Sequence, residues 1–458
     1  MATSVVDVHQ LQKLRPLGKL EEFSSARHHL GFFLNVGIST SYTYESDGPT
    51  DLRESIFSAL SEVIQHHPIL STIPVDEDSP TPYFARLPKI NLEDAVVFTS
   101  RQKSFDGQSE DPELDSLLEK QHNTNFKAHY GSLPFWRLFI LSDPESENKF
   151  VASFIYHHAL GDGASGIVFQ KHFYSALMAT PLPLKSKIIS PPTMTLLLNL
   201  ELLHPLPIPA PPSSTPSNPW TAGLIHVPMR TVIQTLIIPK DLTSQFLHTC
   251  RARSTTLTST LSVLIARTLA EVLPLDARVF KGTIPVNIRR FLPRDRVTDD
   301  DMGVWIDTMP IYYCRENLSV ETLWKEAQRT RDVISTYLAS SGQPSSGQFM
   351  NVARMKQRGD MRELFLSMVG QERDSTFEIS NLGVVKVDEA GSGAWKMGGF
   401  GFSRSAFAAG AVFSIGVITG CDGCLNLGFS WQEGMMERKV TRSIVEGVSA
   451  EIERVVGQ

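Results

Sequence analysis

A proline- and serine-rich segment near the middle of the chain limits the folds that it can adopt. From Pro181 to about Pro228 the sequence includes HPLPIPAPPSSTPSNPW, and proline at this density prevents continuous helix or sheet. One or two helical turns around MTLLLNLELL remain compatible with it. The 458 residues make up about three typical domain lengths. We therefore expect an N-terminal lobe at residues 1–180, a linker at 181–228 and a C-terminal lobe at 229–458.

Strand and helix patterns occur in both halves, which predicts the α/β (α+β) class. NVGISTSYTYE alternates and predicts a half-buried strand, TDLRESIFSALSEVIQHHP has helical spacing, and FWRLFIL and KFVASFIYHH predict strands buried on both faces. In the second half, TTLTSTLSVLIARTLAEVL predicts a helix with Thr258 as its N-cap. Further strands are predicted at TVIQTLII, VFKGTIPVNIRR, VWIDTMPIYYC, TFEISNLGVVKV, AVFSIGVITG and CLNLGFSWQ, and further helices at VETLWKEAQRTRDVISTYL and at the C-terminus.

Composition excludes several classes of function. The net charge is −6 and no basic stripe occurs, which argues against a nucleic-acid partner. We see no apolar leader and no run long enough to span a membrane.

Cys421 and Cys424 form a lone C-x-x-C around Asp422-Gly423, which predicts a hairpin turn. Zinc would need two more nearby ligands, so we predict no metal site, reduced thiols and a cytoplasmic protein.

The stretch SFIYHHALGDGASG, residues 153–166, supports two interpretations. Its glycines spell G-x-G-x-x-G, the dinucleotide-binding pattern, between a predicted strand and a predicted helix. That pattern requires an acidic residue about twenty positions later, and residues 167–200 contain none. Asp162 inside the loop would also repel a pyrophosphate. Both points argue against a dinucleotide.

Acid–base chemistry fits the same stretch better. His157 and His158 end a buried strand, so their side chains point to opposite faces, and a neutral histidine can accept a proton near pH 7. Asp162 can cap the following helix or pair with an arginine. The alternative is that two histidines merely finish a strand. The other doublets, at 28–29 and 66–67, lack the x-x-x-Asp-Gly that follows this one.

The heptad HHALGDG resembles the active-site motif of the chloramphenicol-acetyltransferase-like acyltransferases. The blocks LEEFSSARHHLGFFLNVG, HHPIL, LPFWRL, LTSTLSVLIA, VNIRRFLP and ISNLG resemble fungal alcohol acetyltransferases, in the same order and over nearly the whole chain. The D-F-G-W-G motif of the plant branch is absent. No carrier domain is attached, which favours a free thioester such as acetyl-CoA.

This resemblance implies a fold and a site. It implies two similar lobes, each a mixed sheet flanked by helices, with an active-site tunnel at their junction. His158 would be the catalytic base, and Asp162 would be structural, paired with Arg289 in preference to Arg290. Gly163 would act through its backbone. The implied reaction moves an acetyl group from acetyl-CoA to a hydroxyl, with no permanently bound cofactor.

The oxyanion donor is not determined by the sequence. Ser380 and Asn381 are polar residues within an apolar strand, and they are candidates for oxyanion or substrate contacts. Capping of a strand irregularity explains them equally well. Ser165 stands in no G-x-S-x-G elbow, so a serine hydrolase is not supported.

The acceptor alcohol is also open. Phe32, Phe33, Trp305 and the stretch FGFSRSAF can line an apolar pocket or belong to the core. We expect a hydroxylated fungal secondary metabolite, a terpenoid or a polyketide, and a monomeric enzyme. Peripheral association with lipid droplets or the endoplasmic reticulum is an alternative to a free cytoplasmic enzyme. A catalytically silent or condensation-like protein of the same fold is the alternative function.

Overall fold

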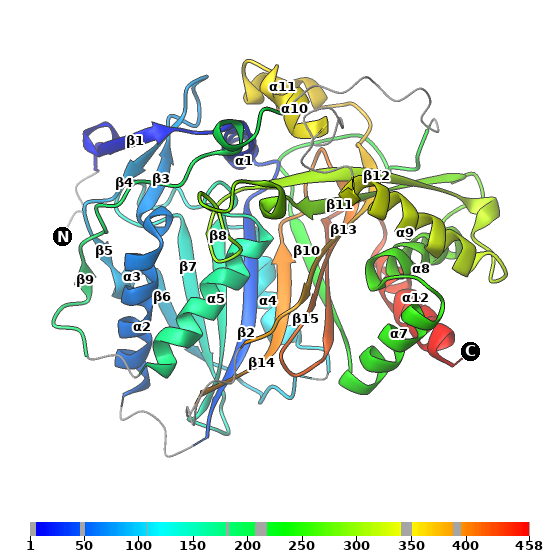
Figure 1. Ribbon diagram of the computed structural model, residues 1–458, viewed down its shortest axis with the longest axis horizontal. Helices are drawn as coiled ribbons and strands as arrows, with labels where there is room; N and C mark the ends of the chain where they lie inside the picture. Colours follow the sequence, from blue (N-terminus) through cyan, green and yellow to red (C-terminus); the bar gives the residue numbers. More distant parts are fainter. Residues whose placement is uncertain are drawn as a thin grey trace.

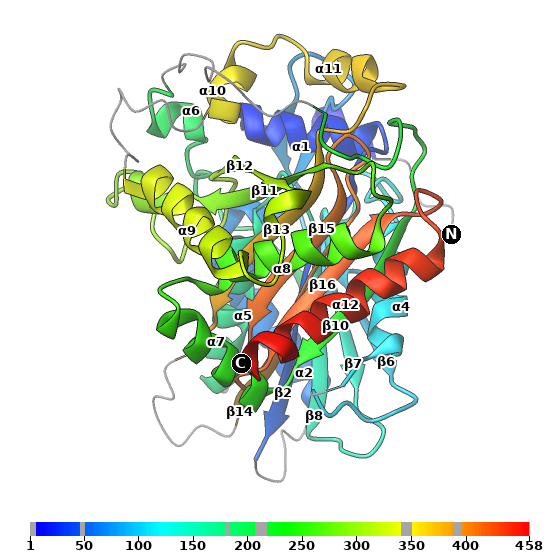
Figure 2. The same ribbon diagram turned by 90° about the vertical axis from the view of Figure 1, so that its right-hand side faces the viewer.

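The computed structural model describes residues 6–45, 51–107, 109–179, 183–206, 218–339, 350–387 and 395–457. Two large mixed sheets lie side by side, and Figure 1 shows α2 and α5 against one and α7, α8, α9 and α12 beside the other. Figure 2, turned by 90°, shows these last four helices in front of the second sheet. The predicted class, a mixed α/β protein with two sheet-rich lobes, is confirmed.

The first lobe is built on a sheet of order β14-β2-β8-β7-β6, antiparallel except for the parallel pair β6–β7. Its strands are β2 (Asn35–Tyr44), β6 (Val96–Ser100), β7 (Trp136–Ser142), β8 (Lys149–His157) and β14 (Trp395–Arg404). The helices of this half are α1 (Lys19–His29), α2 (Leu52–His66), α3 (Leu92–Ala95), α4 (Pro112–His122), α5 (Gly163–Met178) and α6 (Leu200–Leu203). Smaller antiparallel pairings join β1 (Gln12–Pro16), β4 (Tyr83–Arg86) and β3 (Thr72–Val75), and β5 (Ile90–Asn91) with β9 (Ile188–Ile189).

The second lobe is built on a sheet of order β10-β16-β15-β13-β11-β12. Its strands are β10 (Thr231–Ile238), β11 (Val279–Asn287), β12 (Ile306–Cys314), β13 (Ser375–Val384), β15 (Ala411–Thr419) and β16 (Leu425–Gln432). The helices are α7 (Lys240–Ala252), α8 (Leu257–Val272), α9 (Leu323–Ala339), α10 (Met350–Lys356), α11 (Met361–Met368) and α12 (Arg438–Val456). Each sheet has its own hydrophobic core.

Strand β14 joins the two lobes. It belongs to the second half of the chain but pairs with β2 at the edge of the first sheet, as Figure 1 shows. It also packs on the second sheet, where a Cβ at Gly416 or Gly428 would lie only 2.4 or 2.3 Å from the backbone oxygen of Phe402. Glycine at these two positions therefore permits the close approach of the sheets. The boundaries at 180 and 229 stay a prediction.

Two sequence-based expectations about local structure were wrong. Strand β2 is almost wholly buried rather than half-buried, because it lies inside the sheet and both α5 and α4 pack against it. The N-cap of α8 is Thr256 and not Thr258, since Thr256 Oγ1 accepts from the Ser259 amide and Ser259 Oγ accepts from the Thr256 amide. This reciprocal capping box satisfies two amide groups that a cap at Thr258 would leave open.

Parts of the predicted linker pack against both lobes. Strand β9 pairs with β5, and α6 lies against α1 in the first half. The amide of Trp220 donates to the Val279 oxygen in the second lobe. Residues 180–182 and 207–217 lie outside the described residues. The predicted hairpin turn at Cys421–Cys424 is confirmed: it joins β15 to β16, and all four cysteines are free thiols.

Candidate active site

The two histidines at the end of β8 have different surroundings. His157 is fully buried; its Nδ1 accepts from the Ala159 amide at 3.0 Å, and its Nε2 lies 3.6 Å from Glu77 Oε1. His158 points to the other side, is partly exposed and lines a cavity. This division follows from the alternation of side chains along a strand. Only His158 can meet a small molecule in this cavity.

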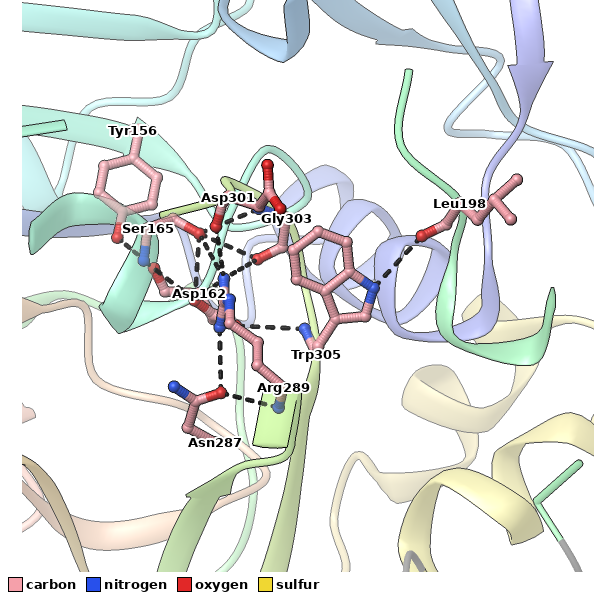
Figure 3. A network of polar contacts seen from close by, with 9 residues as sticks. All are labelled: Tyr156, Asp162, Ser165, Leu198, Asn287, Arg289, Asp301, Gly303 and Trp305. Atoms are coloured by element: carbon pink, nitrogen blue, oxygen red, sulfur yellow. Dashed lines mark hydrogen bonds and ion pairs between the residues drawn. The ribbon is translucent and has the colours of Figure 1, made fainter. Parts of the chain in front are cut away.

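The loop between β8 and α5 is held by a buried ion pair, drawn in Figure 3. Arg289 Nη1 lies 2.7 Å from Asp162 Oδ2 and Arg289 Nη2 lies 3.0 Å from Asp162 Oδ1, a bidentate pair that is almost completely buried. Asp162 Oδ1 also accepts from the Ser165 amide, so the same carboxylate is the N-cap of α5. Asp162 therefore both caps the helix and pairs with an arginine. Arg290 is exposed and stacks on Phe291 instead.

Backbone groups complete this network. The Trp305 amide donates to Asp162 Oδ2 at 3.1 Å, and the Asp162 amide donates to the Gly303 oxygen at 3.0 Å. Arg289 Nη2 donates further to the oxygens of Asp301 and Gly303. Such bonds are what allow a charge pair to be buried without a large penalty. The loop that carries His158 is thus fixed to the second lobe.

A cavity of about 450 Å³ lies between the lobes, beside His158. Its wall takes residues from both halves: α1, β2, His158 and the start of α5 on one side, and β11, β12, β13, α11 and β14 on the other. Much of the lining is apolar, and it includes Phe23, Phe33, Val304, Ile306, Leu364, Phe365, Met368, Leu382, Phe402 and Phe407. The volume falls within the range of about 300–1,000 Å³ that is usual for small-molecule sites.

Burial and nearby charges favour the neutral form of the His158 ring. Burial lowers the pKa of His158 well below its usual value, and the nearby positive charges of Arg27 and Arg404 lower it further. The Nδ1 atom is buried and has no hydrogen-bond partner among the described residues. A neutral imidazole has a free lone pair at neutral pH, which is the form that a general base requires.

Two arginines in the cavity were missed by the sequence analysis. Arg27 is 7% exposed and forms no ion pair with the described residues, and three phenylalanine rings lie around it, the nearest being Phe33 at 4.1 Å. Burial lowers the pKa of Arg27 to about 9, so it stays charged at neutral pH. Arg404 pairs with Glu378, but its Nε and Nη2 have no partner in the part of the chain that the structure describes. The available signal was helical spacing: Leu20, Ser24 and Arg27 share one face of α1 and all line the cavity.

The remaining predicted site residues are divided between cavity and framework. Ser380, Asn381 and Gly163 all line the cavity. Asn381 is engaged in the framework, since its Nδ2 donates to Thr258 Oγ1 at 2.8 Å and its Oδ1 accepts from the Gly383 amide. A Cβ at Gly163 would lie 2.9 Å from Leu382 Cδ2, so this position has room only for glycine unless Leu382 moves.

The aromatic residues proposed for the pocket also divide. Phe33 lines the cavity, as do Phe402 and Phe407 of the FGFSRSAF stretch. Phe32 is fully buried in a small core cluster, and Trp305 is buried with its Nε1 donating to the Leu198 oxygen. For Phe32 and Trp305 the second of the two alternatives therefore holds: both rings belong to the core, because packing occupies them.

A family model described as alcohol acetyltransferase matches residues 16–182 and 215–450, most of the chain. The chain belongs to the alcohol acetyltransferase family. It is therefore an acyltransferase, and the resemblance seen in the sequence is confirmed. Membership of this family implies use of an acyl-CoA co-substrate.

Relatives match over nearly their full length. The probable alcohol acetyltransferase crmB of Aspergillus fumigatus is 38% identical over 453 residues, which cover 94% of this chain and 97% of that protein. The probable alcohol acetyltransferase FCK4 of Fusarium pseudograminearum is 22% identical, with 96% and 94% covered. Both relatives of this alcohol acetyltransferase are fungal.

Solved structures share the fold. The trichothecene 15-O-acetyltransferase TRI3 of Fusarium sporotrichioides superposes with a TM-score of 0.68 at 13% identity, covering 96% of this chain and 95% of that one. The first condensation domain of the CDA synthetase superposes with a TM-score of 0.63, also at 13% identity, covering 97% and 96%. At such low identity these likenesses show the two-lobed fold alone.

No helix among the described residues is long and apolar enough to cross a membrane.

Proposed function

We propose that this alcohol acetyltransferase transfers the acetyl group of acetyl-CoA directly to the hydroxyl of a small alcohol, with His158 as the general base. The observation that carries the proposal is the position of His158, a neutral imidazole on the wall of a cavity between the lobes. Acceptor and thioester would meet at this ring.

In the proposed reaction no acyl-enzyme forms. Nδ1 of His158 is buried, so Nε2 is the nitrogen that takes the acceptor's hydroxyl proton. The acceptor oxygen attacks the thioester carbon and forms a tetrahedral oxyanion. The carbon–sulfur bond then breaks, and the imidazolium returns the proton to the departing CoA thiolate. General-base catalysis of this type contributes about 10²- to 10⁴-fold.

The oxyanion needs a donor in the cavity. Ser380 lines the cavity, and its hydroxyl forms no hydrogen bond with the described residues, so it is available. Asn381 is already bonded to Thr258 and Gly383, which makes it the poorer candidate. We propose that Ser380 donates to the oxyanion and that the positive charges of Arg27 and Arg404 stabilise it electrostatically.

We propose a hydroxylated fungal secondary metabolite, a terpenoid or a polyketide, as the acceptor. The apolar and aromatic wall of the cavity supports an acceptor with a large apolar body. The acceptor of the structural neighbour TRI3 is a trichothecene, and the sequence relatives are fungal. The proposal also includes the domain bounds, with lobes at residues 1–180 and 229–458. It further includes a monomeric state and a cytoplasmic location.

Release of free CoA thiol tests the proposal. The full chain is incubated with acetyl-CoA and a panel of hydroxylated terpenoids, polyketides and simple alcohols, and an arm with amines tests for condensation-like chemistry. We expect thiol release with some alcohols, and its loss in His158→Ala but not in His248→Ala, an exposed histidine on α7. Wild-type protein that releases no thiol above background with any acceptor would identify the catalytically silent alternative. Turnover that survives in His158→Ala would show that His158 is not the general base.

A further inference from the structure

Three histidines from two packed helices gather away from the acyl-transfer cavity. His66 ends α2 and His67 follows it, while His172 lies on α5. The centroid of the His66 ring lies 4.8 Å from the centroid of the His67 ring and 4.8 Å from that of the His172 ring. The centroids of the His67 and His172 rings lie 4.7 Å apart. One nitrogen from each ring lies within 4.8 Å of the others. Three imidazoles at this spacing are a ligand set for a transition-metal ion.

The shortest contact in the cluster joins two ring nitrogens. His67 Nε2 and His172 Nδ1 lie 2.6 Å apart, so they share one proton. Zn–N bonds of about 2.0–2.1 Å would place two ligands of a tetrahedral ion about 3.4 Å apart. The pair would have to open by less than 1 Å, to about that separation, for a metal ion to replace the proton. His66 is exposed at the helix end and can turn toward the same point.

The charges around the cluster favour a cation. Asp300 and Asp301 lie close enough to act on His172 with two negative charges, against one positive charge from Lys171. A cavity of about 90 Å³ lined by His66, His67 and Asp301 provides room for a water molecule as fourth ligand.

A second cluster of metal-ligating side chains lies beside a lysine. His28, Glu77 and His157 are also close together, but all three are fully buried, and Lys127 Nζ lies 3.1 Å from Glu77 Oε2. A cation is therefore already present beside that carboxylate. Arg15, which lines the cavity beside the three histidines, is paired with Glu21 instead.

We infer that His66, His67 and His172 form a binding site for a divalent transition-metal ion of the Zn²⁺ class, which clamps α2 to α5. The lone C-x-x-C predicted no metal site, and these histidines lie far from it in the sequence. The new site is independent of the proposed acyl transfer. It lies beside the 301–305 loop, whose Gly303 and Trp305 backbone groups hold Asp162, so the bound ion would also support that loop.

Metal titration of the full chain, carrying no polyhistidine tag, tests the inference. After treatment with a chelator, Zn²⁺ is titrated by calorimetry and Co²⁺ by its visible absorption. We expect one equivalent to bind with micromolar affinity or tighter, tetrahedral absorption for Co²⁺, and a higher thermal midpoint with Zn²⁺. In His66→Ala and His172→Gln the affinity should fall at least about 100-fold.

Control variants locate the binding. His248→Ala and His158→Ala should both bind the ion like the wild type, because neither ring belongs to the cluster. His66 is exposed, so its alanine variant should keep the wild-type circular dichroism spectrum even if His172→Gln is destabilised. The inference is overturned by a wild-type protein that binds neither ion stoichiometrically. Binding that persists in both cluster variants, or that is lost in His158→Ala, overturns it equally.

Discussion

Arg289 and Arg27 are both buried arginines at the junction of the lobes, and their surroundings differ. Both terminal nitrogens of Arg289 bond to Asp162, and backbone oxygens accept further bonds. Among the described residues, the Arg27 side chain has a long contact to Ser24 Oγ at 3.4 Å and the faces of aromatic rings around it, while the buried Nε atoms of both arginines have no partner there. The charge of Arg289 therefore stabilises the fold. The charge of Arg27 is available to interact with a ligand in the cavity.

The largest effect should come from breaking the Asp162–Arg289 pair. Arg289→Met leaves a buried carboxylate without its partner, which should lower the free energy of unfolding by about 3–5 kcal/mol. Denaturant unfolding measures this. In a double-mutant cycle with Asp162→Asn the two losses should be far from additive. Additive losses would mean that the pair does not act as a unit.

Replacing His158 should affect the rate and leave stability nearly unchanged. His158→Ala should lower kcat about 10²- to 10⁴-fold, because it removes the proposed base. The neighbouring His157→Gln tests the converse: His157 faces the Glu77 cluster, so its loss should reduce stability by about 1–3 kcal/mol with activity per folded molecule retained. Steady-state kinetics together with thermal unfolding separate the two outcomes. Equal effects of both variants on kcat would contradict the division of roles.

Arg27→Met sharpens the comparison with Arg289. Removing this buried charge should leave the free energy of unfolding unchanged or raise it, since Glu378, which attracts Arg27, keeps its ion pair with Arg404. We expect kcat/KM to fall about 10- to 100-fold, the loss of one charged interaction in the transition state. Unfolding and kinetics are measured on the same preparation. A loss of stability as large as that of Arg289→Met would place Arg27 in the framework.

The pH profile gives a smaller effect with a defined sign. The pKa of His158 lies below its usual value, so kcat/KM should stay level through neutral pH and fall only under acidic conditions, where the ring gains a proton. Arg27→Met removes a positive charge that opposes this protonation. The acidic limb should therefore move to higher pH in the variant. A limb that stays in place or moves to lower pH would contradict the proximity of Arg27 to the base.

The smallest effect distinguishes Ser380 from Asn381. Asn381→Ala should cost about 1 kcal/mol of stability through the lost bonds to Thr258 and Gly383. Ser380→Ala should leave stability intact and lower kcat. Thermal unfolding and kcat measured on both variants check this. If only Asn381→Ala lowered kcat, Asn381 would be the oxyanion donor and Ser380 would not.

The sequence predicted features that depend on local pattern. Alternation and helical spacing located β8, α2 and α8, and the heptad located His158 and Asp162 between a strand and a helix. The Arg289 contact was reached only through the family resemblance, because nothing in the spacing of residues 162 and 289 brings them together. Arg27 and Arg404 were missed for a related reason. They lie on α1 and β14, which are far apart in the sequence and come together only in the folded protein.

Strand β14 was not predicted at all. Its sequence WKMGGFGFSR contains three glycines, which weaken a strand signal, and its alternation is interrupted by an irregularity between Met397 and Phe400. Its place beside β2 depends on contacts between residues more than 350 positions apart. No local pattern encodes such a contact.

The position of β14 also bears on how the protein is made. A ribosome has already released the whole of β2, β7 and β8 long before residues 395–404 emerge. Until then the backbone groups along one side of β2 lack their partner strand, and an unpaired edge of this kind invites association with other chains. The nascent chain must therefore keep that edge protected through more than half of its synthesis. Completion of the first sheet and completion of the second would then be nearly simultaneous events.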